Sequence, residues 1–169
     1  MPEQDCRSGL GWDIHRLVSG RPLILGGVHI PSELGPAGHS DADVLSHAIT
    51  DAILGAASLG DIGQHFPDSD PRWAGADSLI FLRRAQELAA ERGFAIINVD
   101  ATVIMERPKL SPYRAAIREK LAETLGLDPE RVSVKFKTAE AIGPIGETRA
   151  AEAFAVATLC RRVPVRGAG

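Results

Sequence analysis

The chain has only two cysteines in 169 residues, so little in it could cross-link the fold. Cys6 and Cys160 lie near opposite ends of the sequence, and they form neither a CxxC pair nor a disulfide framework. Such cysteines are typical of a cytosolic protein, where thiols are kept reduced. We therefore predict two free thiols and a cytoplasmic location.

Long apolar segments and an excess of one charge are also missing. Met1–Leu10 is mostly polar, which predicts no signal peptide, and the apolar run around Ala52–Leu59 is too short to span a bilayer. The formal net charge is -3 with scattered lysines and arginines, which argues against a nucleic-acid-binding patch. An anionic ligand would need local attraction from a metal ion, a few lysines or a helix N-terminus.

What is present suits one domain over residues 1–169, with its core within residues 8–160. Hydrophobic residues make up 44% of the chain, and 17 glycines with 11 prolines predict many turns without a low-complexity tract. The last residues, Arg161–Gly169, show no pattern, and we predict a frayed end without a function.

Periodicity along the chain predicts an α+β fold. We expect a four-stranded mixed sheet with three helices on one face plus a small β-hairpin. The other face must then be buried by something else, such as another subunit. The expected strands are Ser8–His15, Ile96–Met105, Arg131–Lys137 and Thr148–Arg161, the hairpin is Leu23–Ile30, and the helices are Ser40–Gly60, Asp77–Arg92 and Ser111–Gly126.

The helix expected over Ser40–Gly60 has the clearest pattern. Apolar residues recur at helical spacing through its middle and predict a buried stripe. Ser40 is the expected N-cap, with Asp43 three residues later as in a capping box. Asp43, His47 and Asp51 are spaced by four residues, so they form a polar stripe beside the apolar one.

Asp13 and His15 are the first candidates for chemistry. Residues two apart on a strand point the same way, so both side chains would project from one face, with Ile14 turned to the core. His47 supplies a second imidazole, and the acidic residues one turn away could hold its tautomer. Two histidines and a carboxylate match a catalytic zinc site with an open fourth position. Alone, an Asp–x–His tripeptide is more often a surface pair without a metal.

Four further segments carry groups suited to an anionic ligand. Gly38–Asp41 precedes the long helix, whose N-terminal N–H groups could bind an anion. The Gly60–Gly75 loop is rich in aspartates, which could accept hydrogen bonds from a sugar-like ligand. Met105–Ser111 is a proline-stiffened loop with a lysine, and Lys135–Glu140 ends in groups that could meet a phosphate and a hard cation. Each segment also has an ordinary explanation as a helix cap or a solvated loop.

The order of these motifs is more specific than any one of them. It closely resembles the 2-C-methyl-D-erythritol 2,4-cyclodiphosphate synthase family of the non-mevalonate isoprenoid pathway, from Ser8 to Leu159. The segments that carry the resemblance are Gly11–Arg16, Leu25–Pro31, His39–Val44, His47, Thr50–Ala52, Leu59–Gly63, Phe66–Asp70, Pro108–Lys109 and Lys137–Glu140.

The resemblance implies a homotrimer with its sheets around a three-fold axis and active sites between adjacent subunits. It implies conversion of 4-diphosphocytidyl-2-C-methyl-D-erythritol 2-phosphate to the 2,4-cyclodiphosphate and CMP. Zn²⁺ or Mn²⁺ would bind Asp13, His15 and His47, and Glu140 would hold Mg²⁺ or Mn²⁺ with the substrate diphosphate. His39 and Thr138 match positions that stabilise the transition state. The implied substrate contacts are Ser40, Asp61, Ile62, Gly63, Phe66, Pro67, Asp68, Ser69, Asp70, Met105, Pro108, Lys109, Leu110, Ser111, Phe136, Lys137 and Glu140.

The chain departs from the usual family pattern at Ala141–Arg149. Compared with the usual family pattern, this segment is shorter and lacks an aromatic residue and an arginine. In the family, this region lines a cavity on the trimer axis. We therefore expect no isoprenoid diphosphate to bind there in the usual way. Two other functions fit the residues: a different metal-dependent phosphoryl-transfer enzyme or phosphohydrolase, or a non-catalytic trimeric nucleotide-binding protein.

Overall fold

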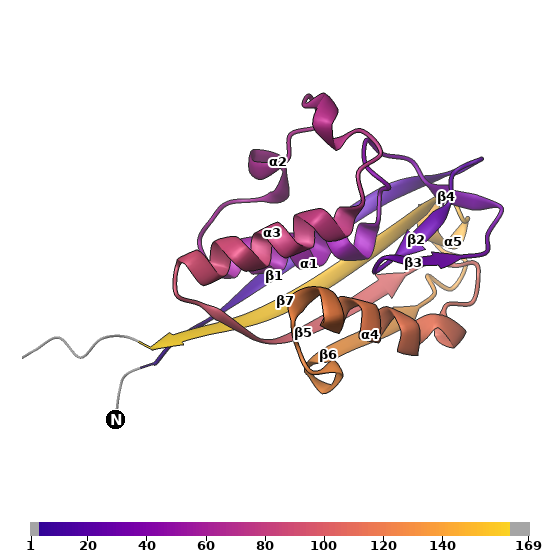
Figure 1. Cartoon of the computed structure of the whole chain (residues 1–169). Coiled ribbons are helices and arrows are strands. Elements are labelled where there is room, and N and C mark those ends of the chain that lie inside the picture. The colour runs from indigo at the N-terminus through magenta and orange to yellow at the C-terminus, as the bar shows by residue number, and fades with distance from the viewer. Residues whose placement is uncertain (1–3, 163–169) are drawn as a thin grey trace, which may run out of the picture.

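The computed structural model describes residues 4–162, and a long antiparallel pair of strands runs through its centre (Figure 1). β1 (Gln4–Ser19) and β7 (Ala150–Arg162) pair along almost their whole length. β1 is twice as long as the strand expected from the sequence, while β7 confirms the strand expected near the end of the chain.

Within the described residues, the main sheet has five strands in the order β4-β1-β7-β5-β6. β5 (Ala95–Ile104) pairs antiparallel with β7 and parallel with β6 (Val132–Lys137). The expected hairpin forms separately from β2 (Leu23–Leu25) and β3 (Val28–Ile30). The expected sheet of four strands is wrong by one strand. β4 (Leu34–Pro36) is too short to show a period in the sequence, and it pairs with the end of β1.

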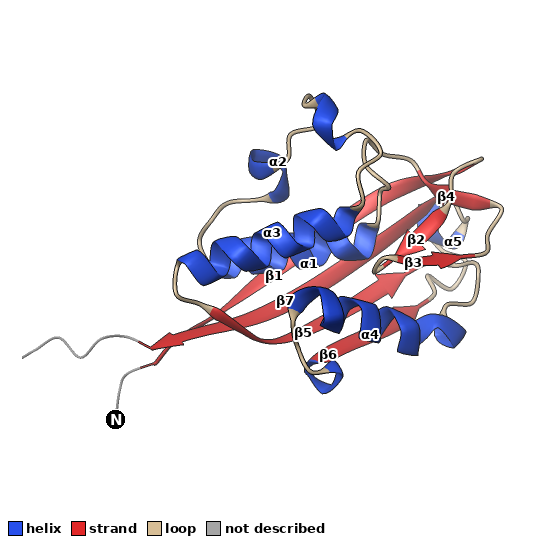
Figure 2. Cartoon of the chain, in the orientation of Figure 1, coloured by secondary structure: helices blue, strands red, loops and turns tan. Residues whose placement is uncertain are grey.

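Three long helices cover one face of this sheet, as predicted (Figure 2). α1 lies directly on β1 and β7, α3 packs against α1, and α4 covers β6. The helices are α1 (Val44–Ala56), α3 (Ser78–Glu91) and α4 (Arg114–Leu125), with short helices α2 (Ile62–His65) and α5 (Gly143–Gly146) and 3₁₀ turns at Pro71–Trp73, Ser111–Tyr113 and Pro129–Arg131.

α1 approaches the sheet closely because the strands beneath it carry small residues. Gly9 and Gly11 of β1 face the helix, and a Cβ at either position would collide with the α1 backbone. β7 presents a row of buried alanines on the same face: Ala151, Ala153, Ala155 and Ala157. This close packing sets the distance between β1 and the first turn of α1, where the candidate metal ligands lie.

The opposite face of the sheet carries an exposed apolar patch on β1 and β7. The exposed fractions are 70% for Leu10, 49% for Trp12 and 41% for Ile14, and Phe154 and Val156 extend the patch on β7. The prediction that Ile14 turns to the core is wrong, because the odd-numbered residues of β1 face the helices. Such a patch is typical of a surface that binds another chain, as the predicted subunit contact requires.

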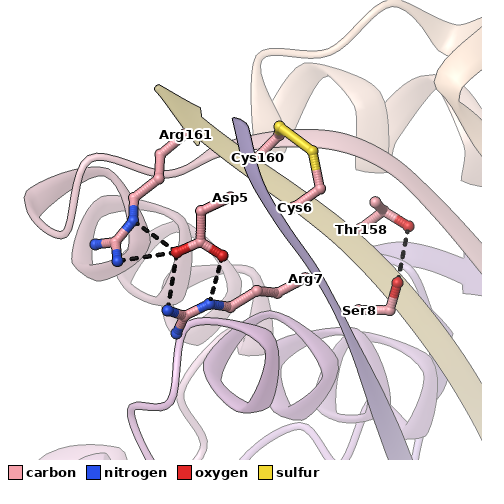
Figure 3. Close-up of a disulfide and its surroundings, with 7 residues drawn as sticks. All are labelled: Asp5, Cys6, Arg7, Ser8, Thr158, Cys160 and Arg161. Atoms are coloured by element: carbon pink, nitrogen blue, oxygen red, sulfur yellow. Dashed lines mark hydrogen bonds and ion pairs between the residues drawn. A yellow bond between two sulfur atoms is a disulfide. The ribbon is translucent and has the colours of Figure 1, made fainter. Parts of the chain in front are cut away.

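Cys6 and Cys160 lie directly opposite each other on β1 and β7 and form a disulfide (Figure 3). The prediction of two free thiols is wrong. Although 154 residues separate the cysteines in sequence, the strand register brings their Cα atoms to 4.1 Å. Asp5, one position before Cys6, accepts hydrogen bonds from Arg7 of β1 and Arg161 of β7. These contacts link the two strands next to the disulfide.

No helix in the described part of the chain is long and apolar enough to cross a membrane. Arg161 and Arg162 belong to β7, and the rest of the segment predicted to be frayed lies outside the described residues. The single-domain boundary stays a prediction.

Candidate metal centre and substrate cavities

The side chains of Asp13, His15 and His47 meet between β1 and α1. Asp13 and His15 are odd-numbered residues of β1 and point to the helix side, just beyond Gly11. His47 lies in the first turn of α1, which packs closely on this part of the strand. The structure therefore brings together the three residues that the sequence analysis grouped.

One carboxylate oxygen of Asp13 lies at the centre of the cluster. Asp13 Oδ2 is 2.9 Å from His15 Nε2 and 3.0 Å from His47 Nδ1, and these two nitrogens are 3.3 Å apart. All three side chains are half-buried, with exposed fractions of 12–24%. The three atoms could hold a metal ion that a ligand still reaches from one side.

The backbone carbonyl of Ala37 determines which nitrogen of His15 faces the cluster as an acceptor. The Ala37 oxygen is 2.8 Å from Nδ1, and a carbonyl only accepts, so Nδ1–H donates to it. In a neutral His15, Nε2 then carries the lone pair and faces Asp13. Two acceptors at this distance repel each other unless a proton or a metal ion lies between them. The donor set therefore fits a bound cation.

The pKa values of the cluster agree with this conclusion. Burial raises the pKa of Asp13, but the adjacent imidazoles of His15 and His47 outweigh it and lower the pKa to about 2. Burial lowers the pKa of His15, but the hydrogen bond and the charge of Asp13 outweigh it and raise the pKa. The cluster thus favours positive charge at its centre.

The cluster opens into a cavity of about 450 Å³. Gly38, from the segment expected to bind an anion, lines this cavity, but the sequence did not point to Ala37 or to the rings of Trp73 and Phe81 that pack with Phe66. Isolated aromatic residues in a loop and a helix give no signal that they share a wall. The predicted substrate residues that line the cavity are His39, Ser40, Ile62, Gly63, Phe66, Pro67 and Asp68.

The start of α1 differs from the expected anion site. Asp43 rather than Ser40 is the N-cap, and its carboxylate accepts hydrogen bonds from the backbone N–H and the hydroxyl of Ser46. It also accepts from the N–H groups of Gly26 and Gly27, which ties the hairpin turn to the helix. The fully buried carboxylate, whose pKa burial raises, already occupies the position that an external anion would take.

The prediction that an acidic neighbour on α1 holds His47 is also wrong. Asp43 caps the helix, and Asp51 accepts a hydrogen bond from the backbone N–H of Ile62 at 2.7 Å. On the side away from Asp13, His47 Nε2 instead faces two hydroxyls, those of Ser78 at 2.8 Å and Ser40 at 3.2 Å. Neither serine could be connected with His47 from its position in the sequence.

Three residues of the acidic loop have local roles and do not line the metal cavity. Asp61 caps α2 by accepting from the N–H of Gln64. Asp70 caps the 3₁₀ turn that follows it and pairs with the guanidinium of Arg72, which lowers the Asp70 pKa. Ser69 is exposed at the tip of the loop. Their predicted substrate contacts remain predictions.

Part of the Met105–Ser111 loop, which the resemblance assigns to substrate binding, lines a second cavity of about 590 Å³. Pro108 and Lys109 line it, whereas Met105 and Leu110 are buried in the core, so only their backbone could meet a ligand. Ser111 begins the 3₁₀ turn before α4 and is exposed. The other lining residues are Ser32, Glu33, Leu34, Glu106, Arg107 and Thr148.

Thr138 and Glu140 follow β6 and line neither of these cavities. The Thr138 hydroxyl donates to Glu140 Oε1 at 2.5 Å, and both residues are exposed, so the groups predicted to meet a phosphate and a cation are hydrogen-bonded to each other. Phe136 is half-buried under the guanidinium of Arg114, and Lys137 is exposed at the end of β6.

The predicted site residues therefore fall into two groups at different places on the sheet. The metal group lies on β1 and on α1, which packs over β1, whereas Lys109 and Thr138 follow β5 and β6. Because β7 lies between β1 and β5, the two groups are two to three strand spacings apart, about 10–15 Å. Among the described residues, none lines both cavities.

An Asp–His–His cluster that could hold a metal ion, open to a polar and aromatic cavity on an α+β fold, is typical of a metal-dependent enzyme that acts on a small molecule. Comparison of the sequence with known families identifies the protein family. A sequence model of the YgbB family matches residues 6–160, and the chain belongs to the YgbB family.

Individual proteins that are similar to this chain carry more specific names. A 2-C-methyl-D-erythritol 2,4-cyclodiphosphate synthase of Solibacter usitatus (strain Ellin6076) is 67% identical over 155 residues, which cover 92% of this chain and 98% of that protein. A solved 2C-methyl-D-erythritol-2,4-cyclodiphosphate synthase with bound CDP is 44% identical, with a TM-score of 0.84, and the match covers 90% of this chain and 99% of that one. Bifunctional IspDF from Campylobacter jejuni is 41% identical, with a TM-score of 0.91, and the match covers 95% of this chain and 43% of that one. These comparisons confirm the resemblance found in the sequence.

Proposed function

We propose that this chain is a 2-C-methyl-D-erythritol 2,4-cyclodiphosphate synthase, which closes a cyclic diphosphate and releases CMP. The observation that carries this proposal is the Asp13–His15–His47 cluster at the mouth of a cavity, in a chain 67% identical to a synthase of that name. The CDP bound in a related structure supports a cytidine diphosphate ligand.

The reaction places few demands on acid–base chemistry. An oxygen of the 2-phosphate attacks the β-phosphorus of the diphosphocytidyl group. The bond between that phosphorus and the bridging oxygen breaks, and CMP leaves with the oxygen. The nucleophile is already an anion, so no strong base is needed. The enzyme must instead bring two anions together and neutralise the charge that develops.

The metal cluster suits this task. A Zn²⁺ or Mn²⁺ ion held by Asp13, His15 and His47 would supply positive charge to a phosphate oxygen. The two imidazoles favour zinc. The half-buried position limits solvent screening around the three ligands, which strengthens their interaction with a cation.

His39 supplies a further hydrogen-bonding group in the same cavity. Its Nε2 lies 3.2 Å from the carbonyl oxygen of Asp70, which only accepts, so Nε2–H donates and holds the ring across the loop. This geometry supports its proposed role in stabilising the transition state.

The second group of residues completes the site when another subunit supplies it. Lys109 and the backbone around it would bind the cytidine end, and Thr138 and Glu140 would meet the diphosphate and a Mg²⁺ or Mn²⁺ ion. A homotrimer would bury the apolar outer face and could place the second group of one subunit beside the metal cluster of the next. A cytoplasmic location remains part of the proposal.

Phosphorus NMR of the substrate incubated with the protein, Zn²⁺ and Mg²⁺ tests the proposal. We expect one cyclic diphosphate and CMP in equal amounts, and no product after a chelator is added. Linear phosphate products would instead identify a phosphohydrolase. CMP binding without turnover would identify a nucleotide-binding protein.

A further inference from the structure

The imidazole of His47 is held from its far side by a chain of hydrogen bonds to the start of α3. His47 Nε2 lies 2.8 Å from the hydroxyl of Ser78, the first residue of α3. That hydroxyl in turn contacts Asp41 Oδ1, and the other Asp41 oxygen accepts the backbone N–H of Ser78 at 3.1 Å. Ser78 is fully buried, so water does not compete for these contacts.

The number of available protons determines which group donates in each of these hydrogen bonds. A carboxylate only accepts hydrogen bonds, so the single hydroxyl proton of Ser78 goes to Asp41. Ser78 Oγ must then accept from His47, and Nε2 carries the imidazole proton. The reverse order would leave the Ser78 and Asp41 oxygens in contact without a proton between them.

This direction leaves His47 Nδ1 as the lone-pair nitrogen. Nδ1 is the atom 3.0 Å from Asp13 Oδ2 and 3.3 Å from His15 Nε2. The Ala37 carbonyl fixes the tautomer of His15 in a similar way. The tautomer of His47 instead depends on the side chains of Ser78 and Asp41, which lie outside α1. The Ser40 hydroxyl is farther from Nε2, at 3.2 Å, and its oxygen already accepts the N–H of Ala42.

We infer that Ser78 and Asp41 are positioning residues for the metal site, which fix the tautomer and the orientation of His47 so that Nδ1 meets the ion. The inference rests on the proposed role of His47 as a metal ligand. Asp41 has a second role, because it binds the backbone of α3, but Asp77 already caps that helix. The carboxylate oxygen that reaches the Ser78 hydroxyl is therefore not required for capping α3, although it also accepts the backbone N–H of Asp43 at 3.2 Å.

Zinc affinity tests this inference independently of turnover. We expect Ser78→Ala and Asp41→Asn to weaken zinc binding about 10- to 100-fold, measured by competition with a chelating dye, as loss of a partner to a metal-bound histidine does elsewhere. Ser78→Thr keeps the hydroxyl and should restore most of the affinity. The Co²⁺-substituted protein should show an altered visible spectrum in Ser78→Ala and a normal one in Ser78→Thr.

Thr50→Ala is the matched control. Thr50 is also fully buried, lies on α1 with His47, and donates its hydroxyl to the Ser46 carbonyl. Removing it costs a buried hydrogen bond without touching the imidazole. Equal losses of zinc affinity in Thr50→Ala and Ser78→Ala would show a general structural effect and overturn the inference.

The His47→Ala variant distinguishes the role of His47 as a metal ligand from the positioning role of Ser78 and Asp41. If His47→Ala loses zinc while both Ser78→Ala and Asp41→Asn keep wild-type affinity, the positioning role is wrong and the ligand assignment stands. If His47→Ala keeps stoichiometric zinc, the ligand assignment itself is wrong. Should Ser78→Ala fail to fold, Asp41→Asn still decides the question, because it keeps the shape of the side chain.

A nitrogen-detected NMR spectrum of the metal-free protein gives a second readout. The wild-type imidazole of His47 should carry its proton on Nε2, and Ser78→Ala should lose this single tautomer. A wild-type His47 that carries its only proton on Nδ1 would contradict the direction of the hydrogen-bond chain.

Discussion

The two groups of predicted site residues are built in opposite ways. The metal group lies on a strand and a helix, and the outer nitrogen of each histidine has its own hydrogen-bond partner. The second group lies on loops after β5 and β6, and its polar side chains Lys109, Thr138 and Glu140 are exposed. The difference shows that one chain brings the three metal-site side chains together, whereas the polar groups of the second group are not gathered in one cavity.

The largest effect should come from His47→Ala, which breaks the preorganised group. We expect activity to fall at least about 10³-fold, because the charge that offsets the developing negative charge is lost. Circular dichroism should stay unchanged, because the side chain lies at the edge of a cavity. Zinc content and turnover, measured on the same sample, check the result. Wild-type zinc content in the variant would contradict it.

Thr138→Ala should reduce turnover by about 10²-fold if its hydroxyl stabilises the transition state. Zinc content should remain normal, because Thr138 is not one of the three proposed zinc ligands. His47→Ala should lose both zinc and turnover, whereas Thr138→Ala should lose turnover alone. This difference distinguishes the metal group from the second group.

Mixing these two inactive variants tests whether neighbouring subunits share a site. Trimers formed at random from equal amounts of His47→Ala and Thr138→Ala should regain about a quarter of wild-type activity, since one site in four receives both intact groups. The subunits must be co-expressed or refolded together, and separately prepared variants mixed without exchange serve as the control. No regained activity would show that each site lies within one chain.

Lys109→Ala should have a smaller effect. Lys109 is exposed and acts only through charge at the rim of the second cavity, so we expect KM to rise about 10-fold with little change in kcat. Lys120→Ala, which removes a surface lysine paired with Glu123 on α4, is the matched control. A fall in kcat with unchanged KM would move Lys109 into the chemical step.

Cys6→Ser should have the smallest effect on activity, because the disulfide lies at the other end of β1. We expect kcat and KM within about 2-fold of wild type. The free energy of unfolding should fall by about 2–5 kcal/mol, since the disulfide closes a long loop in the unfolded chain. Calorimetry with and without a thiol reductant checks this, and equal stability of the oxidised and reduced wild type would contradict it.

Local signals in the sequence were enough for much of the fold. Periodicity along the chain predicted the hairpin at Leu23–Ile30 and the strand that became β7, and the apolar stripe predicted α1. The missing strand, Leu34–Pro36, is too short to carry a period. The N-cap was misplaced because Ser40 and Asp43 are both suitable residues, and only the hairpin turn beneath them favours Asp43.

The metal ligands were predictable because each carries its own chemical signal. Asp13 and His15 share one side of a strand by spacing alone, and the order of motifs linked them to His47. The contacts that orient these ligands carry no such signal. Ala37 acts through its backbone, and Ser78 is separated from His47 by 31 positions.

The sequence by itself thus determined the secondary-structure pattern, the family and the chemistry of the cluster, because these depend on residue type and local spacing. The tertiary structure decided which side of β1 faces the helices, that Cys6 meets Cys160, and that Ser78 and Asp41 hold His47. These outcomes depend on strand register and on the close packing of α1 against Gly9 and Gly11, which bring distant residues to within hydrogen-bonding distance.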